Sequence, residues 1–169
     1  MSKIYIAVED AYAPRALWII VNNLRIAKKN IVIDHLLPCS TKMRRIINAA
    51  FLSYDKIIVI ADAERKDPEK VKRKIKQKCL AGKRNGHVII TRPCIEEWPC
   101  KVLGLKGCNQ DPVRAINNYW MKKRGNRYRK ALLGRIFEEA FEKSAPFSSI
   151  KNFPDSLREF IKILKSKDH

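Results

Sequence analysis

Acidic residues are scarce in this 169-residue chain, in which 17 Asp and Glu oppose 36 Lys and Arg, so that the formal net charge is +19. Long apolar runs are also lacking. The longest, residues 16–21, is far below the ~20 residues that cross a bilayer. No charged-then-apolar leader precedes the first strand-like segment. We therefore expect a cytoplasmic protein that makes no use of a membrane.

Cysteine is limited to five residues, and no two of them form a CxxC pair. We expect buried thiols, because the spacings match no structural zinc pattern. A zinc site from Cys94, Cys100 and Cys108 with a histidine stays open as an alternative. Glutamine is rare beside abundant Lys, Arg and Ile, which hints at a thermophile, where an intracellular disulfide is less unusual.

Glycine-rich phosphate loops are absent as well, which argues against a nucleotide-hydrolysing motor. What the chain does contain is enough apolar residues, 46%, to build a folded core. We expect one domain over residues 1–169, with an α/β core in 1–100 and a helical extension in 101–169.

Strand-like and helix-like segments alternate over the first 92 residues. The predicted strands are residues 3–8, 31–36, 56–60 and 87–91, and the predicted helices are 14–29, 41–53 and 67–79. Such alternation implies right-handed crossovers, and hence a mainly parallel four-stranded sheet with helices on both faces. After a loop with one short element, further helices are predicted at 111–121, 127–143 and 154–165, with a linker at 144–149.

The few carboxylates gather in three groups, each of which follows a predicted strand: Glu9 with Asp10, Asp62 with Glu64, and Glu96 with Glu97. In open parallel sheets functional residues collect at the carboxyl ends of the strands. Each group alone could serve as a helix cap. Three groups on one edge instead predict a pocket for Mg²⁺ or Mn²⁺, because clustered carboxylates repel one another unless a cation lies between them.

These residues resemble the Toprim-like family. The resemblance rests on a Glu after the first strand, an acidic pair after the third, and residues 93–98 (PCIEEW), which are similar to a Pro-Cys-Phe-Glu-x-Trp signature. That signature belongs to small prokaryotic defence proteins of the RloB and overcoming-lysogenisation-defect kind. Residues 156–160 (SLREF) similarly resemble a Ser-Phe-x-x-Phe ending in those families.

The resemblance implies that Glu9 is a general acid or base that also contacts the metal, and that Asp62 and Glu64 are metal ligands. Glu96 would be a further acid of the catalytic pocket, with Trp98 as a packing residue. Two departures matter. The family pair is usually Asp-x-Asp, and the residue after the first Glu is commonly Gly, where this chain has Asp10.

Basic residues concentrate in two stretches, which we expect to neutralise the phosphates of DNA or RNA. The candidate nucleic-acid contacts are Lys72, Arg73, Lys76, Lys122, Lys123, Arg124, Arg127, Arg129 and Lys130. The function expected from the whole pattern is Mg²⁺-dependent phosphoryl transfer, as in a nuclease. The alternative is a non-catalytic, RecR-like binding or adaptor protein. A second copy of the chain or a partner ATPase stays open as a further partner.

Overall fold

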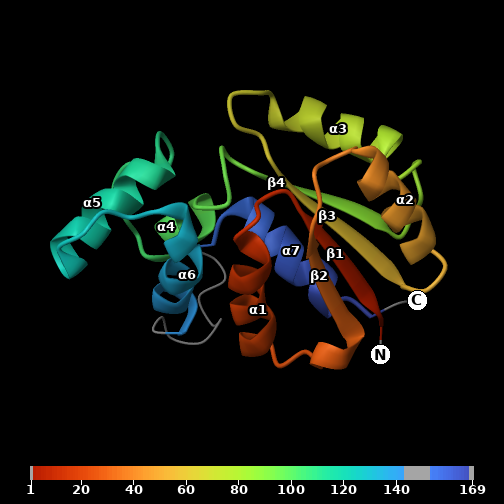
Figure 1. Ribbon diagram of the computed structural model, residues 1–169, viewed down its shortest axis with the longest axis horizontal. Helices are drawn as coiled ribbons and strands as arrows, with labels where there is room; N and C mark the ends of the chain where they lie inside the picture. Colours follow the sequence, from red (N-terminus) through yellow and green to blue (C-terminus); the bar gives the residue numbers. More distant parts are fainter. Residues whose placement is uncertain (1, 143–152, 168–169) are drawn as a thin grey trace.

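The structure is a computed structural model, and it describes residues 2–142 and 153–167 (Figure 1). Four parallel strands form one sheet in the order β2-β1-β3-β4. They are β1 (Ile4–Val8), β2 (Ile31–His35), β3 (Lys56–Asp62) and β4 (Gly86–Thr91). The predicted α/β fold with a parallel four-stranded sheet is confirmed.

Helices cover both faces of this sheet. The α-helices are α1 (Ala13–Asn23), α2 (Thr41–Ala50), α3 (Pro68–Lys78), α4 (Glu97–Val102), α5 (Pro112–Arg124), α6 (Leu133–Glu142) and α7 (Asp155–Lys165), with 3₁₀ turns η1 (Lys28–Asn30) and η2 (Lys130–Leu132). In Figure 1, α2 and α3 lie on one side of the sheet, α1 and α7 lie on the other, and α4 to α6 extend beyond α1. The predicted C-terminal helices are thus present.

Two hydrophobic cores separate along alternating residues of each strand. In β1, Ile4, Ile6 and Val8 belong to the core shared with α1, α4, α5, α6 and α7. Tyr5 and Ala7 belong to the core beneath α2 and α3. Because side chains alternate between the faces of a strand, a strand covered on both sides reads as one continuous apolar run.

Side chains predicted to cap helices do so. Ser40 accepts a hydrogen bond from the backbone N–H of Met43 at 3.1 Å, and Asp111 accepts one from Arg114 at 3.0 Å. Gly125 ends α5 with φ of +76°, a conformation that glycine adopts without steric cost.

Several predicted boundaries were wrong. The helix expected over 14–29 ends at Asn23, since Arg25 takes a left-handed conformation and η1 leads into β2. The helix expected from 127 begins as η2, and α6 starts only at Leu133. β3 continues two residues beyond prediction, because Asp62 pairs with Thr91 of β4. The linker predicted at 144–149 lies outside the described residues.

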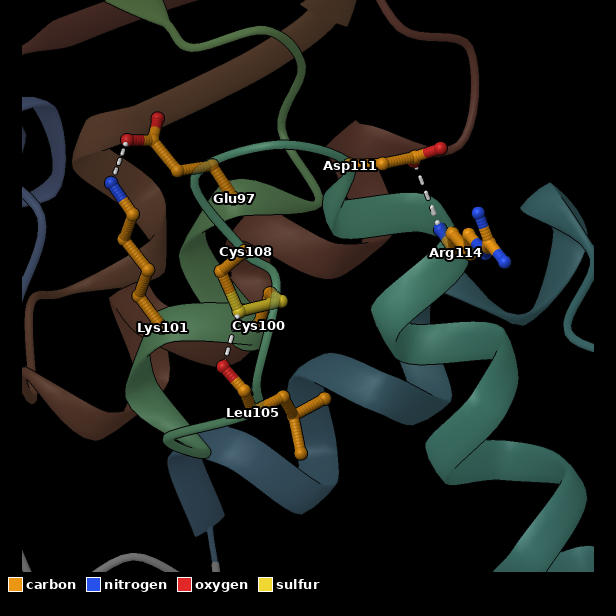
Figure 2. Close-up of a disulfide and its surroundings, with 7 residues drawn as sticks. All are labelled: Glu97, Cys100, Lys101, Leu105, Cys108, Asp111 and Arg114. Atoms are coloured by element: carbon orange, nitrogen blue, oxygen red, sulfur yellow. Dashed lines mark hydrogen bonds and ion pairs between the residues drawn. A yellow bond between two sulfur atoms is a disulfide. The ribbon is translucent and has the colours of Figure 1, made fainter.

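The prediction of buried thiols was wrong for four of the cysteines. Cys39 after β2 is joined to Cys79 at the end of α3, and Cys100 is joined to Cys108 (Figure 2). Their Cα atoms lie 5.2 and 5.8 Å apart, within the normal disulfide range. Cys94 remains a free thiol. Sequence spacing does not reveal such pairs, because the fold brings the partners together.

Within the described ranges, no helix combines the length and the apolar character that crossing a bilayer requires.

Candidate active site

Glu9 and Asp62 meet at the carboxyl end of the two central strands. Glu9 extends the pairing of β1, since its N–H donates to the carbonyl of Ile60 at 3.0 Å. Its side chain turns toward β3, where Oε2 accepts a hydrogen bond from the N–H of Asp62 at 2.8 Å. The backbone of β3 therefore holds the Glu9 carboxylate beside the Asp62 carboxylate, as the strand-end argument predicted.

The ionised form of the Asp62 carboxyl is unfavourable in this position. Its pKa is raised from 3.8 to about 7, chiefly by burial. The negative charges of Glu9 and Glu96 also raise the pKa, whereas the hydrogen bond from Thr91 and the positive charge of Lys130 lower it. The Thr91 hydroxyl donates to Oδ1 of Asp62 at 2.5 Å. A carboxylate in this position gains from a nearby cation, because a positive charge offsets both burial and like-charge repulsion.

Glu96 lies in the same neighbourhood but is paired with a lysine. Its side chain is fully buried, and Oε1 accepts from Nζ of Lys130 at 2.5 Å and from the Tyr128 hydroxyl at 3.4 Å. The same ammonium lies 2.6 Å from Oδ2 of Asp10. Burial alone would lower the pKa of Lys130, yet Glu96 and Asp10 outweigh it and raise that pKa above the ordinary value. Lys130 therefore supplies a positive charge between two of the acidic groups.

The remaining predicted carboxylates are placed differently. Glu64 is exposed at the rim of the pocket described below, and its N–H donates to the carbonyl of Pro93 at 2.8 Å. Glu97 is buried and has partners of its own. It accepts from the N–H of Arg92 at 2.7 Å and from Nζ of Lys101 at 2.9 Å (Figure 2). Glu97 thus stabilises the turn into α4 rather than contributing to the cluster.

A pocket of about 540 Å³ opens beside Glu9 and Asp62. The apolar part of its wall comes from the β2–α2 loop, β3 and α3. Three lysines, Lys66, Lys70 and Lys74, also line it. Carboxylates and ammonium groups in one pocket suit a substrate that carries phosphate, which lysine binds directly and a carboxylate binds through a metal ion.

Glu9 and Asp62 together offer two carboxylates to a small divalent cation. No group of three or more His, Cys, Asp or Glu residues capable of holding a metal occurs in residues 2–142 and 153–167. Mg²⁺, however, commonly keeps several waters and uses only one or two protein carboxylates. The pKa of Asp62 is raised first by burial and then by the nearby charge of Glu9, and a cation would offset both effects.

The predicted nucleic-acid contacts are dispersed. Lys123 and Arg124 on α5 pair with Glu139 of α6 at 3.2 and 2.8 Å. Lys72 pairs with Glu159 of α7 at 3.3 Å. The others besides Lys130 are exposed on α3 or around the end of α5: Arg73, Lys76, Lys122, Arg127 and Arg129.

Sequence reasoning identified only part of what surrounds the Glu9–Asp62 pair. It expected the basic stretch from Lys70 to Lys83 to line the approach to the pocket, but the contacts that it named there, Lys72, Arg73 and Lys76, do not line it, whereas Lys66, Lys70 and Lys74 do. Their spacing of four residues was the signal that could have found them. Thr91 carried no signal beyond its place at the end of a strand.

The two short strings behind the Toprim resemblance contact each other. The indole N–H of Trp98 donates to Oγ of Ser156 at 2.9 Å, and its ring stacks on Phe160 with centroids 5.4 Å apart. Trp98 is fully buried, which confirms that it is a packing residue. The contact fastens α7 to α4 and so to the loop that carries Glu96.

No protein-family model matches the chain, and no curated protein or solved structure shows a significant match to it. The function therefore has to be inferred from the fold and from the residues around Glu9 and Asp62.

Proposed function

We propose that the protein is a Mg²⁺- or Mn²⁺-dependent phosphoryl-transfer enzyme that cleaves nucleic acid. The observation that carries the proposal is the meeting of Glu9 and Asp62, from neighbouring parallel strands, in a pocket that also presents three lysines. The net charge of +19 supports a polyanionic substrate.

Each group in the pocket has a role that its chemistry allows. Glu9 and Asp62 would hold the metal ion, which when bound polarises a phosphate oxygen and lowers the pKa of a water molecule. Glu9 is held in place by the N–H of Asp62 and can accept a proton at its carboxylate. The lysines hold the phosphates of the substrate. Glu64, at the exposed rim, is the third ligand that the Toprim resemblance implies.

A second candidate is the non-catalytic, RecR-like binding protein, and the position of Lys130 favours it. This lysine already neutralises Glu96 and Asp10, so these two acids need no metal ion. A protein of this kind would bind nucleic acid without a metal, with a steep dependence on salt and no turnover.

Cleavage assays separate the two candidates. Labelled single-stranded DNA, duplex DNA and RNA are incubated with the protein in Mg²⁺, Mn²⁺ or chelator. We expect cleavage only with metal, and at least a ~100-fold loss in Glu9→Gln and in Asp62→Asn, because both carboxylates touch the reacting centre. Glu138→Gln, an exposed carboxylate of α6, is the matched control and should cleave normally.

Full activity in either pocket variant, at an equal folded fraction, would reject the enzymatic proposal. Mn²⁺ titration gives a readout that does not depend on substrate choice. A rise in melting temperature that disappears in Asp62→Asn supports the metal site, whereas binding of nucleic acid without any metal effect supports the RecR-like alternative.

A further inference from the structure

We propose that Lys66, Lys70 and Lys74 form a track for the phosphodiester backbone of one nucleic-acid strand and lead it to Glu9 and Asp62. The inference deepens the proposed function and rests on it for the identity of the pocket. The substrate is then a single strand of nucleic acid, which is held by its backbone without regard to base sequence.

The spacing of the three lysines is the first argument. Lys70 and Lys74 lie four residues apart on α3 and therefore on the same side of the helix, and Lys66 lies four residues earlier, in the loop before it. All three line the pocket that contains Glu9 and Asp62. Four residues of helix rise ~6 Å, a step comparable with the distance between successive phosphates of an extended strand.

The second argument is that these three ammonium groups form no ion pair with a described residue, although Glu64 and Asp67 also line the pocket. Lys72, on another face of α3, is paired with Glu159. In contrast, no ion pair within the described part of the chain involves Lys66, Lys70 or Lys74, and all three are exposed. Like charges on one face of a helix destabilise it, and phosphates would remove that repulsion.

The lining of the pocket indicates what is recognised. Its apolar walls come from Pro38, Cys39, Ala61, Ala63, Val71 and Ile75, and none of the described residues that line it offers an aromatic ring on which a base could stack. A lysine row without stacking platforms reads the backbone rather than the bases. One row can follow only one strand. A volume of about 540 Å³ admits part of one strand.

The test measures binding in chelator, so that cleavage plays no part. A fluorescein-labelled single strand of about 15 nucleotides is titrated with the wild-type protein and with a K66Q/K70Q/K74Q variant. The control variant, K3Q/K28Q/K29Q, loses the same charge from exposed lysines at the amino ends of β1 and β2, the opposite edge of the sheet. Thermal melts establish that all three proteins are equally folded.

We expect the track variant to bind about tenfold more weakly or worse, and its plot of log K against log salt to be shallower by about 2, since each lost contact to a single strand removes ~0.7. The control should keep the wild-type slope. An equal loss in both variants, or none in the track variant, overturns the track. Unlabelled duplex that competes as well as the single strand overturns the assignment to one strand.

The two proposals can fail separately. If K66Q/K70Q/K74Q binds like wild type while Asp62→Asn abolishes cleavage, the track is rejected and the enzymatic function stands. If the track variant loses binding but no substrate is ever cleaved, the track stands as a binding surface and the enzymatic function is rejected.

Discussion

At the scale of single residues, Asp62 carries the largest electrostatic cost in the pocket. Its carboxyl is buried beside Glu9 and near Glu96, and its pKa rises from 3.8 to about 7. Because the folded state prefers the protonated acid, this group contributes most to stability at low pH. The stabilisation from this group is complete below pH 3.8 and is lost as the pH rises through about 7.

Replacing Asp62 with Asn should therefore stabilise the metal-free protein at neutral and higher pH. In chelator at pH 8 we expect the free energy of unfolding to rise by about 1–3 kcal/mol, with little change at pH 4. Urea unfolding at a series of pH values measures this. Glu64→Gln, at an exposed carboxylate of the same pocket, should change stability by less than ~0.5 kcal/mol. A pH-independent difference for Asp62→Asn would contradict the argument.

Lys130 belongs to a run of basic residues in the sequence, but in the structure it forms ion pairs within the protein. The sequence places it in a stretch of basic residues that we expect to bind phosphate, and the structure places its ammonium between Glu96 and Asp10. Nothing in the local sequence distinguishes it from Arg127 or Arg129, because its partners are distant along the chain. Its contribution to nucleic-acid binding stays a prediction.

Lys130→Met should destabilise the fold by about 2–4 kcal/mol, because it leaves Glu96 buried without its partner. Adding Glu96→Gln to this variant should recover part of the loss, since the buried charge is then gone. Chemical denaturation of the two variants and of Lys122→Met, an exposed neighbour on α5, provides the comparison. If Lys130→Met and Lys122→Met are equally stable, the ion pair contributes little.

At the scale of helices and strands, most of the fold could be predicted. The four strands followed from apolar runs bounded by turn residues, and the helix starts at Ser40, Asp67 and Asp111 followed from their capping side chains. The end of α1 could not be predicted, because it depends on how Arg25 turns the chain into η1 and β2. Pairing across the sheet extended β3 to Asp62, which local sequence does not encode.

The candidate site was predictable to a similar degree. Strand ends identified Glu9, Asp62 and Glu96, which do lie close enough to influence one another. The same reasoning grouped Glu97 with them, and the structure pairs it with the N–H of Arg92 and with Lys101, partners that become visible only in three dimensions. The lysines of α3 required knowledge of which face turns toward the sheet edge.

The two disulfides should contribute differently to the free energy of unfolding, because they close loops of different length. Cys39–Cys79 closes a loop of 40 residues and Cys100–Cys108 one of 8, so loop entropy predicts about 4 and about 2.5 kcal/mol respectively. Double Cys→Ala variants of each pair, compared by denaturation without reductant, measure these values. A reductant should destabilise the wild type and leave the variant lacking all four cysteines unchanged. A larger loss of stability without Cys100–Cys108 than without Cys39–Cys79 would refute the loop-length argument.

At the scale of the whole molecule, the net charge of +19 means that the excess Lys and Arg side chains repel one another on a small surface. Screening by salt weakens this repulsion, since the Debye length falls from roughly 20–30 Å at low salt to ~8 Å at physiological ionic strength. We therefore expect the melting temperature to rise by several degrees between about 20 and about 300 mM NaCl. Calorimetry measures the shift, and K66Q/K70Q/K74Q should show a smaller one. A flat or falling profile would show that ion pairs outweigh repulsion.

The docking of α7 has a consequence for biosynthesis. Leu157, Phe160, Ile161 and Leu164 complete the core that α1 begins, and Ser156 satisfies the indole of Trp98. A nascent chain on the ribosome therefore carries an open apolar surface until residues 155–165 emerge from the exit tunnel. Chaperones that recognise such surfaces would engage the nascent chain until α7 has docked, rather than only until the sheet is complete.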